Sequence, residues 1–195
     1  MQIIFILIGI FFVVKYKKEV LLDKYYFTRG EKMIREEYYS DFLKQLKSLL
    51  KDERNWLANL ANTASLIYNL VPKLNWVGFY LMDSEDVMIL GPFQGQPACV
   101  RIKVGNGVCG TAVAEGKPQL VENVHEFNGH IACDPASLSE LVIPLEIDGT
   151  IIGVLDVDSP AEARFNREDK DYLEKAVKIL IESTDFTPLL ERGDN

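Results

Sequence analysis

Apolar residues recur at three- and four-residue intervals over residues 36–71, which is the spacing of an amphipathic helix. The stripe is interrupted near Lys51 and Asp52 and then resumes, so the pattern predicts two helices in this region. Ser40 and Asp52 are the predicted N-caps, because their side-chain oxygens can accept hydrogen bonds from the first free backbone N–H groups. Pro72 is expected to end the second helix.

The middle of the chain has the alternating or aromatic-rich runs that are typical of β-strands. These runs predict strands over residues 76–81, 87–90, 99–104, 119–121, 141–147 and 150–157. Glycine and proline predict an irregular loop over 91–97, and a short helix is expected over 108–115. Residues 123–137 show no periodicity and are long for a connection, which indicates a functional lid. Asn166 is expected to cap a final helix.

Helix-rich ends around a strand-rich middle predict an α+β fold, with helices on one face of an antiparallel sheet and a pocket on the other. The 195 residues, 48% of them hydrophobic, are ample for one domain and short for two. A net charge of −8 argues against nucleic acid or an anionic membrane as a partner. The odd number of cysteines indicates a reducing compartment, so we expect a cytoplasmic protein.

Residues 1–32 differ from the rest, because an apolar run of twelve residues at 3–14 is followed by lysines. A helix of that length spans about 18 Å, short of the ~30 Å hydrocarbon core, and the flanks do not match a signal peptide. The segment carries +3, so with −8 overall the remainder carries −11. A weak membrane anchor is one interpretation. We favour a translated leader, because residues 29–33 can be encoded by a purine-rich ribosome-binding sequence that ends at Met33. We expect a domain over 33–187 and a tail over 188–195.

Two carboxylates, Asp156 and Asp158, stand two residues apart on a predicted strand and so point to the same face, roughly 7 Å apart. If they are buried, one of them should hold a proton near neutral pH or find a cation. Such a pair suits the binding of a substrate ammonium group and the protonation of a leaving oxygen. The alternative is an exposed strand end with solvated acids.

The hairpin register decides whether Glu140 joins these aspartates. A strict two-residue turn at 148–149 would pair Glu140 with Val157 and turn it away from Asp156 and Asp158. One bulge residue would bring it to their side. We predict such a bulge, or a break in the strand just after Glu140.

All three cysteines, Cys99, Cys109 and Cys133, lie in one 35-residue window, which indicates redox chemistry at a polar site. Cys133 lies in the long loop and is expected to be accessible. Cys109 begins the predicted short helix, where the helix dipole would lower its pKa. Cys99 lies at the mouth of a strand.

Two other interpretations of the cysteines stay open. Each could be a buried small hydrophobic residue, although three such residues in one window disfavour this. They could also bind zinc with His125 or His130, but structural zinc sites usually contain a close Cys-x-x-Cys pair, which is absent here. We therefore expect no metal, and we expect the histidines to be hydrogen-bonding loop residues.

Seven segments carry a more specific pattern: residues 75–80, 91–95, Cys99, 105–112, the stretch around Cys133 and Asp134, 139–144 and 153–159. Together they resemble the free methionine-(R)-sulfoxide reductases, which are single GAF-domain enzymes. The resemblance covers about residues 36–184 and is specific, because ordinary GAF domains lack this set of cysteines. It implies a six-stranded antiparallel sheet with helices on one face and the ligand pocket on the other.

The resemblance also implies an L-methionine (R)-S-oxide reductase without a cofactor. Cys133 would attack the sulfoxide sulfur and become a sulfenic acid, and Cys99 would resolve it as a disulfide. Cys109 would be a supplementary partner, and a thioredoxin-like dithiol would restore the thiols. A homodimer through the terminal helices is also implied.

By the same resemblance, Glu140, Asp156 and Asp158 would bind the free amino group and polarise the sulfoxide. Trp76 and Tyr80 would line the pocket around the methyl group, or be ordinary core aromatics. The alternatives in function are a non-enzymatic GAF module that binds a small ligand and a redox sensor.

Overall fold

The computed structural model describes residues 31–127, 129 and 135–191, with side chains from residue 38 onward. Its contacts divide the chain into two units, residues 1–41 and 42–195, and helix α2 (Glu31–Leu50) runs across the division. None of the helices in these ranges is long and apolar enough to cross a membrane. The apolar run at 3–14 lies outside the described residues, and the expected domain boundary at Met33 stays a prediction.

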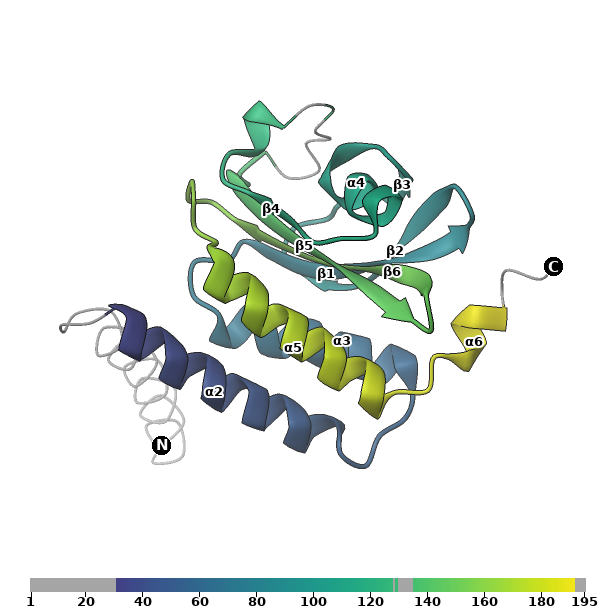
Figure 1. Cartoon of the computed structure of the whole chain (residues 1–195), viewed down its shortest axis with the longest axis horizontal. Helices are drawn as coiled ribbons and strands as arrows, with labels where there is room; N and C mark the ends of the chain where they lie inside the picture. Colours follow the sequence, from purple (N-terminus) through teal and green to yellow (C-terminus); the bar gives the residue numbers. More distant parts are fainter. Residues whose placement is uncertain (1–30, 128, 130–134, 192–195) are drawn as a thin grey trace, which may run out of the picture. The chain divides into compact units, whose positions relative to one another are not determined.

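A six-stranded antiparallel sheet forms the centre of the second unit, in the order β3-β2-β1-β6-β5-β4 (Figure 1). The strands are β1 (Trp76–Ser84), β2 (Val87–Gln94), β3 (Arg101–Lys103), β4 (Gln119–Val121), β5 (Ser139–Ile147) and β6 (Thr150–Ser159). The predicted six-stranded antiparallel α+β arrangement is therefore confirmed. Because β1 pairs with β6, the strand with Trp76 and Tyr80 lies beside the strand with Asp156 and Asp158.

Helices cover both faces of this sheet (Figure 1). Helices α3 (Trp56–Leu70) and α5 (Arg167–Ser183) pack on one face, as the sequence predicts. The short helix α4 (Gly107–Glu115) packs on the opposite face, so the prediction of helices on one face is incomplete. The physical reason is that Val108, Cys109 and Ala112 of α4 are buried and cover apolar strand residues there.

Strand alternation divides the buried side chains into two layers. Every second residue of the central strands packs toward α3 and α5, together with apolar residues from the later part of α2. This layer includes Phe42, Leu46, Leu60, Ile67, Val77, Phe79, Leu141, Ile143, Leu155, Val157, Leu173 and Leu180, all nearly or completely buried. The alternate residues face α4 and form the second layer, which contains the candidate site.

The cap predictions are right at one of three helices. Asn166 caps α5, and its side chain accepts hydrogen bonds from the N–H groups of Glu168 and Asp169 at 2.9 and 3.0 Å. The N-cap of α3 is Asn55 and not Asp52. Ser40 lies inside α2, because helical backbone already begins at Glu31. Helix α3 ends at Leu70, before Pro72, as predicted.

Five of the six predicted strands need a corrected boundary: β1 continues to Ser84, β5 begins at Ser139, β6 ends at Ser159, and β2 and β3 differ as follows. Strand β2 does not stop at Leu90 but continues to Gln94. The register of β2 against β1 shifts here, and Gly91 and Pro92 have no partner residue on β1. The missing N–H of the proline therefore costs no ladder hydrogen bond, and the strand can pass through it. Strand β3 covers only Arg101–Lys103 and is shorter than predicted.

Candidate active site

Three carboxylates share the face of the sheet that α4 covers. Glu140 pairs with Asp158 across β5 and β6, and Asp156 pairs with Val142, so all three acids point to one side. A register shift follows Leu145 in the same strand pair, because Leu145 pairs with Gly153 while the next residue of β5 pairs with Ile151. Ile152 is thus the extra residue, and the predicted bulge that brings Glu140 to the aspartates is confirmed.

Gly153, next to the bulge, allows β6 to approach β1 closely. A Cβ atom on this residue would lie 2.3 Å from the carbonyl oxygen of Tyr80, which is closer than any non-bonded contact allows. The bulge sets the register of β5 against β6 that places the acid side chains, and the glycine allows the close contact with β1.

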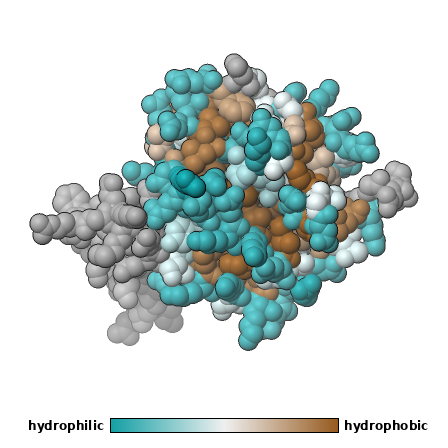
Figure 2. Space-filling model, viewed as in Figure 1, coloured by the Kyte–Doolittle hydropathy of each residue, from teal (hydrophilic) through white to brown (hydrophobic). Residues whose placement is uncertain are grey.

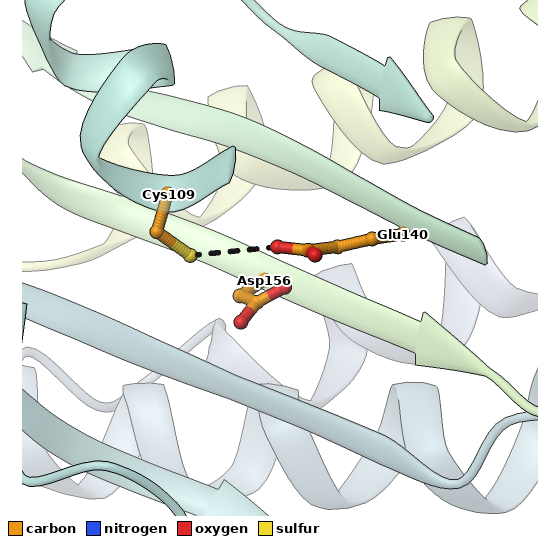
Figure 3. A group of neighbouring side chains, drawn as sticks. All are labelled: Cys109, Glu140 and Asp156. Atoms are coloured by element: carbon orange, nitrogen blue, oxygen red, sulfur yellow. Dashed lines mark hydrogen bonds between the residues drawn. The ribbon is translucent and has the colours of Figure 1, made fainter. Parts of the chain in front are cut away.

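Cys109 of α4 completes a compact cluster with two of the acids. Figure 3 shows the side chains of Cys109, Glu140 and Asp156 pointing toward one another from α4, β5 and β6. The Cys109 Sγ atom donates a hydrogen bond to Oε1 of Glu140 at 3.8 Å. The ligand atoms of the three residues all lie within 4.8 Å of one another. All three residues are buried, so this is a polar cluster inside an apolar layer.

Burial dominates the electrostatics of this cluster. Desolvation, together with the neighbouring carboxylates, raises the pKa of Glu140 well above its usual value. Desolvation also raises the pKa of Asp156, to about 6, against the lowering effect of its hydrogen-bonding neighbours. Within the described part of the chain, no lysine, arginine or histidine forms an ion pair with Glu140 or Asp156. Near neutral pH the pair is therefore expected to hold about one proton.

The prediction of a lowered pKa for Cys109 is wrong. Cys109 does lie in the first turn of α4, but burial and the nearby Asp156 and Glu140 carboxylates raise its pKa well above the usual value. The desolvation cost and two neighbouring acids outweigh the helix dipole, which contributes at most ~2 kcal/mol. Cys109 is accordingly a protonated thiol that donates to Glu140.

The two aromatic residues expected in the pocket lie beside the acids and also hold a loop. Trp76 and Tyr80 are buried on the same face of β1, with their rings stacked at a centroid distance of 5.9 Å. The indole N–H of Trp76 donates to the carbonyl of Gln96 at 3.0 Å, and the phenol of Tyr80 donates to the carbonyl of Cys99 at 3.0 Å. Both side chains therefore connect the site to the segment that carries Cys99.

Sequence reasoning did not identify Gly78 and Phe93 as part of this arrangement. The Trp76 ring lies over Gly78, where a Cβ atom would come within 2.3 Å of the ring, and stacks on Phe93 at 5.4 Å. Strand alternation was the available signal, because it places Gly78 between Trp76 and Tyr80 on one face. A glycine between two large aromatics on a buried face indicates a ring lying across the strand.

The remaining predicted residues are distributed as follows. Cys99 is half-buried and disulfide-bonded, whereas Cys109 is a free thiol. Asp158 is half-buried beside Glu140. Cys133 and His130 lie outside the described residues, so the structure says nothing of their position. His125 lies in the 3-10 helix Val124–Glu126, and its backbone N–H donates to the Asn123 side chain.

A surface groove in the described part of the chain shares no residue with this cluster. It lies beside α5 and is lined by Gly116, Pro118, Ile143, Pro144, Glu146, Glu174, Val177, Lys178, Ile181 and Glu182. Figure 2 shows the side of the molecule on which α5 faces the viewer, where hydrophobic side chains reach the surface among polar ones. The groove brings no cluster of reactive groups together, so the acid cluster remains the candidate site.

The fold and this site define a class of protein. The family model described as GAF domain matches residues 58–178, which is more than half of the chain. A six-stranded antiparallel sheet with helices agrees with that match. The chain therefore belongs to the GAF-domain family.

Several proteins within the GAF-domain family are closely similar to this chain. The chain is 49% identical over 157 residues to the free methionine-R-sulfoxide reductase of Escherichia coli (strain K12), and the match covers 79% of this chain and 94% of that protein. A solved structure of fRMsr of Staphylococcus aureus in complex with substrate is 50% identical, with a TM-score of 0.71, covering 74% of this chain and 94% of that one. The free methionine-R-sulfoxide reductase from Neisseria meningitidis, solved with its substrate, is 42% identical with a TM-score of 0.73, covering 80% and 92%.

Proposed function

We propose that this chain reduces free L-methionine-(R)-sulfoxide to L-methionine. The observation that carries this proposal is the extent of the match to the Escherichia coli reductase, which covers nearly all of that protein. The buried acid cluster adds a chemical reason. A site with two desolvated carboxylates and no described cation beside them favours a ligand that brings positive charge.

The different pKa values of the two acids suggest different roles. Burial and the neighbouring carboxylates raise the pKa of Glu140 well above its usual value, and Glu140 is the proposed proton donor to the sulfoxide oxygen. Asp156, with a pKa of about 6, is mostly ionised at pH 7 and is the proposed partner of the substrate ammonium. Peptide-bound methionine offers only a neutral amide at this point, so the cluster selects the free amino acid.

The proposed chemistry uses the other two cysteines. The Cys133 thiol attacks the sulfoxide sulfur, the oxygen passes to the cysteine sulfur, and methionine leaves, so that Cys133 becomes a sulfenic acid. The Cys99 thiol then condenses with it, releasing water and forming a disulfide, and a thioredoxin-like dithiol reduces that disulfide. The disulfide-bonded state of Cys99 beside a free Cys109 supports Cys99, and not Cys109, as the resolving residue.

An activity assay with dithiothreitol tests the proposal on four substrates, namely both sulfoxide epimers of methionine, each free and peptide-bound. We expect turnover of the free (R) epimer only.

The cysteine variants test the proposed roles. Cys133→Ser should abolish turnover of the free (R) epimer, while Cys99→Ser should still release one methionine per enzyme in a single turnover. Asp156→Asn should raise KM steeply, and Asp86→Asn, the same change in an exposed turn, should not. Turnover by Cys133→Ser at the wild-type rate would overturn the mechanism. Ligand binding without turnover would indicate a sensory GAF module instead.

A further inference from the structure

The cluster of Cys109, Glu140 and Asp156 has the composition of a metal site. It contributes one sulfur and two carboxylate groups from three different elements of a rigid sheet and helix. Thiolate and carboxylate ligands together suit Zn²⁺, which accepts both sulfur and oxygen, and are unlike the all-oxygen sets that bind Ca²⁺ or Mg²⁺.

The distances in this cluster agree with such a site. Tetrahedral zinc with bonds of 2.0–2.3 Å holds its ligand atoms roughly 3.5 Å apart. The Cys109 Sγ and Glu140 Oε1 atoms are 3.8 Å apart, and all three ligand atoms lie within 4.8 Å of one another. The separations thus exceed the spacing around tetrahedral zinc by roughly 1.3 Å at most.

A separate observation shows that, in the described part of the chain, one carboxylate oxygen of the cluster lacks a hydrogen-bond partner. The Oδ1 atom of Asp156 is buried and has no hydrogen-bond partner among the described residues. The residue is only 6% exposed, so water cannot satisfy this oxygen freely. A buried carboxylate oxygen without a partner keeps its desolvation cost, and a cation in the cluster would offset that cost.

We propose that Cys109, Glu140 and Asp156 bind a divalent transition-metal ion of the Zn²⁺ type, and that this ion competes with the substrate. On binding, the Cys109 thiol and the Glu140 carboxyl release their protons to solvent, and the two carboxylates and the thiolate become ligands. Three protein ligands leave a fourth position for water, as in open zinc sites. Competition, though not metal binding itself, rests on the proposed function, because the ion would replace the substrate ammonium beside Asp156.

Cobalt binding tests the site directly. The Cys99→Ser/Cys133→Ser double variant leaves Cys109 as the only thiol in the chain. We expect it to bind one equivalent of Co²⁺ with a thiolate-to-cobalt charge-transfer band, which Zn²⁺ then removes. Cys109→Ser and Cys109→Ala in this background should each lose the band. Asp156→Asn should weaken binding about tenfold or more, because even the loss of a residue that only supports a ligand costs this much. Asp86→Asn should bind like the background.

The outcomes separate the two proposals. In the wild-type enzyme, Zn²⁺ should raise the apparent KM for the sulfoxide without changing kcat. An active enzyme whose double variant shows no thiolate band, or whose bound Co²⁺ has an all-oxygen spectrum, would overturn the metal site and leave the reductase proposal standing. A clear thiolate band in the double variant, together with no reductase activity in the wild-type chain, would support the metal site and overturn the reductase proposal. Near-ultraviolet circular dichroism of each variant checks that the packing around Trp76 is intact.

Discussion

The phenol of Tyr80 donates a hydrogen bond of 3.0 Å to the backbone carbonyl of Cys99, and this bond joins a proposed substrate-binding residue to a proposed redox residue. The indole of Trp76 makes the equivalent bond to Gln96, three residues earlier in the same segment. Both aromatic side chains are buried, although the two hydrogen bonds themselves are only partly buried. Tyr80 and Trp76 thus act on the backbone that positions the Cys99 sulfur, in addition to any contact of their ring faces with substrate.

The first prediction follows from this bond. Tyr80→Phe removes one oxygen and keeps the ring, so the stacking on Trp76 should persist while the Cys99 carbonyl loses its donor. A net hydrogen bond is worth about 1 kcal/mol, which corresponds to about a fivefold slower resolving step. Rapid-quench measurements should show normal methionine release in the first turnover and slower formation of the disulfide.

Tyr68→Phe is the matched control, because Tyr68 lies on α3, on the other side of the sheet, and loses the same atom. Its kinetics should match those of the wild type. If Tyr80→Phe raised KM instead and left the disulfide step unchanged, the phenol would act on the substrate and not on the loop.

The buried acids predict a pH dependence of stability. Burial raises the pKa of Asp156 from 3.8 to about 6, so the folded state holds this proton more tightly than the unfolded state does. That contribution is fully present below pH 3.8 and is lost as the pH rises toward and through 6. The loss is on the order of 3 kcal/mol. Asp156→Asn carries no such charge, so it should be more stable than the wild type at pH 8, and the difference should shrink toward pH 4.

Thermal unfolding at pH 4, 6 and 8 measures this effect as a Tm difference of several degrees at pH 8. Asp86→Asn, the same change at an exposed side chain, is the matched control. A Tm difference for Asp156→Asn that is the same at all three pH values would mean that shape, and not charge, causes it.

The contact between Gly78 and Trp76 gives a third prediction. Gly78→Ala would place a Cβ atom 2.3 Å from the outer edge of the indole and 2.5 Å from the Cβ of Phe93. Overpacking of this kind costs about 1–3 kcal/mol. Trp76→Phe removes the outer ring atoms, so the alanine should cost less in that background. A double-mutant cycle in urea should therefore show a coupling energy of about 1 kcal/mol, and strict additivity would mean that the ring has already moved away.

The fold was predictable from the sequence where local rules determine it. The hairpin register, the bulge and the Asn166 cap depend on spacing and on side-chain chemistry within a few residues, and the structure bears them out. The extension of β2 through Pro92 was not predictable, because it depends on an irregular register against β1, a strand that local sequence rules treat separately. The prediction that Asp52 caps α3 was wrong because Asn55, three residues later, can accept the same hydrogen bond and is the N-cap.

In the candidate site, too, features set by local sequence were predictable and features set by distant residues were not. Alternation on β6 and the bulge were enough to bring Glu140, Asp156 and Asp158 to one face. The state of Cys109 was not predictable, because its pKa is set by burial and by carboxylates more than thirty residues away in the chain. Helix position was a correct local observation, but long-range desolvation is the stronger effect.

The last prediction concerns the connection between the end of α3 and the start of α5. Arg164 forms a buried ion pair with Asp169 at 3.2 Å and donates to the carbonyl of Pro72 at 3.1 Å, with side-chain exposures of 8% and 0% for the pair. Asp169→Asn removes the carboxylate that faces Arg164 in a site with little water, and such losses typically cost about 3–5 kcal/mol. Lys170 and Glu174 form a comparable pair at 3.1 Å, but they are partly exposed, so Glu174→Gln should cost less than about 1 kcal/mol. Urea unfolding of both variants measures the difference directly. Equal costs would show that water reaches Arg164 and that the buried pair contributes no more than a surface one.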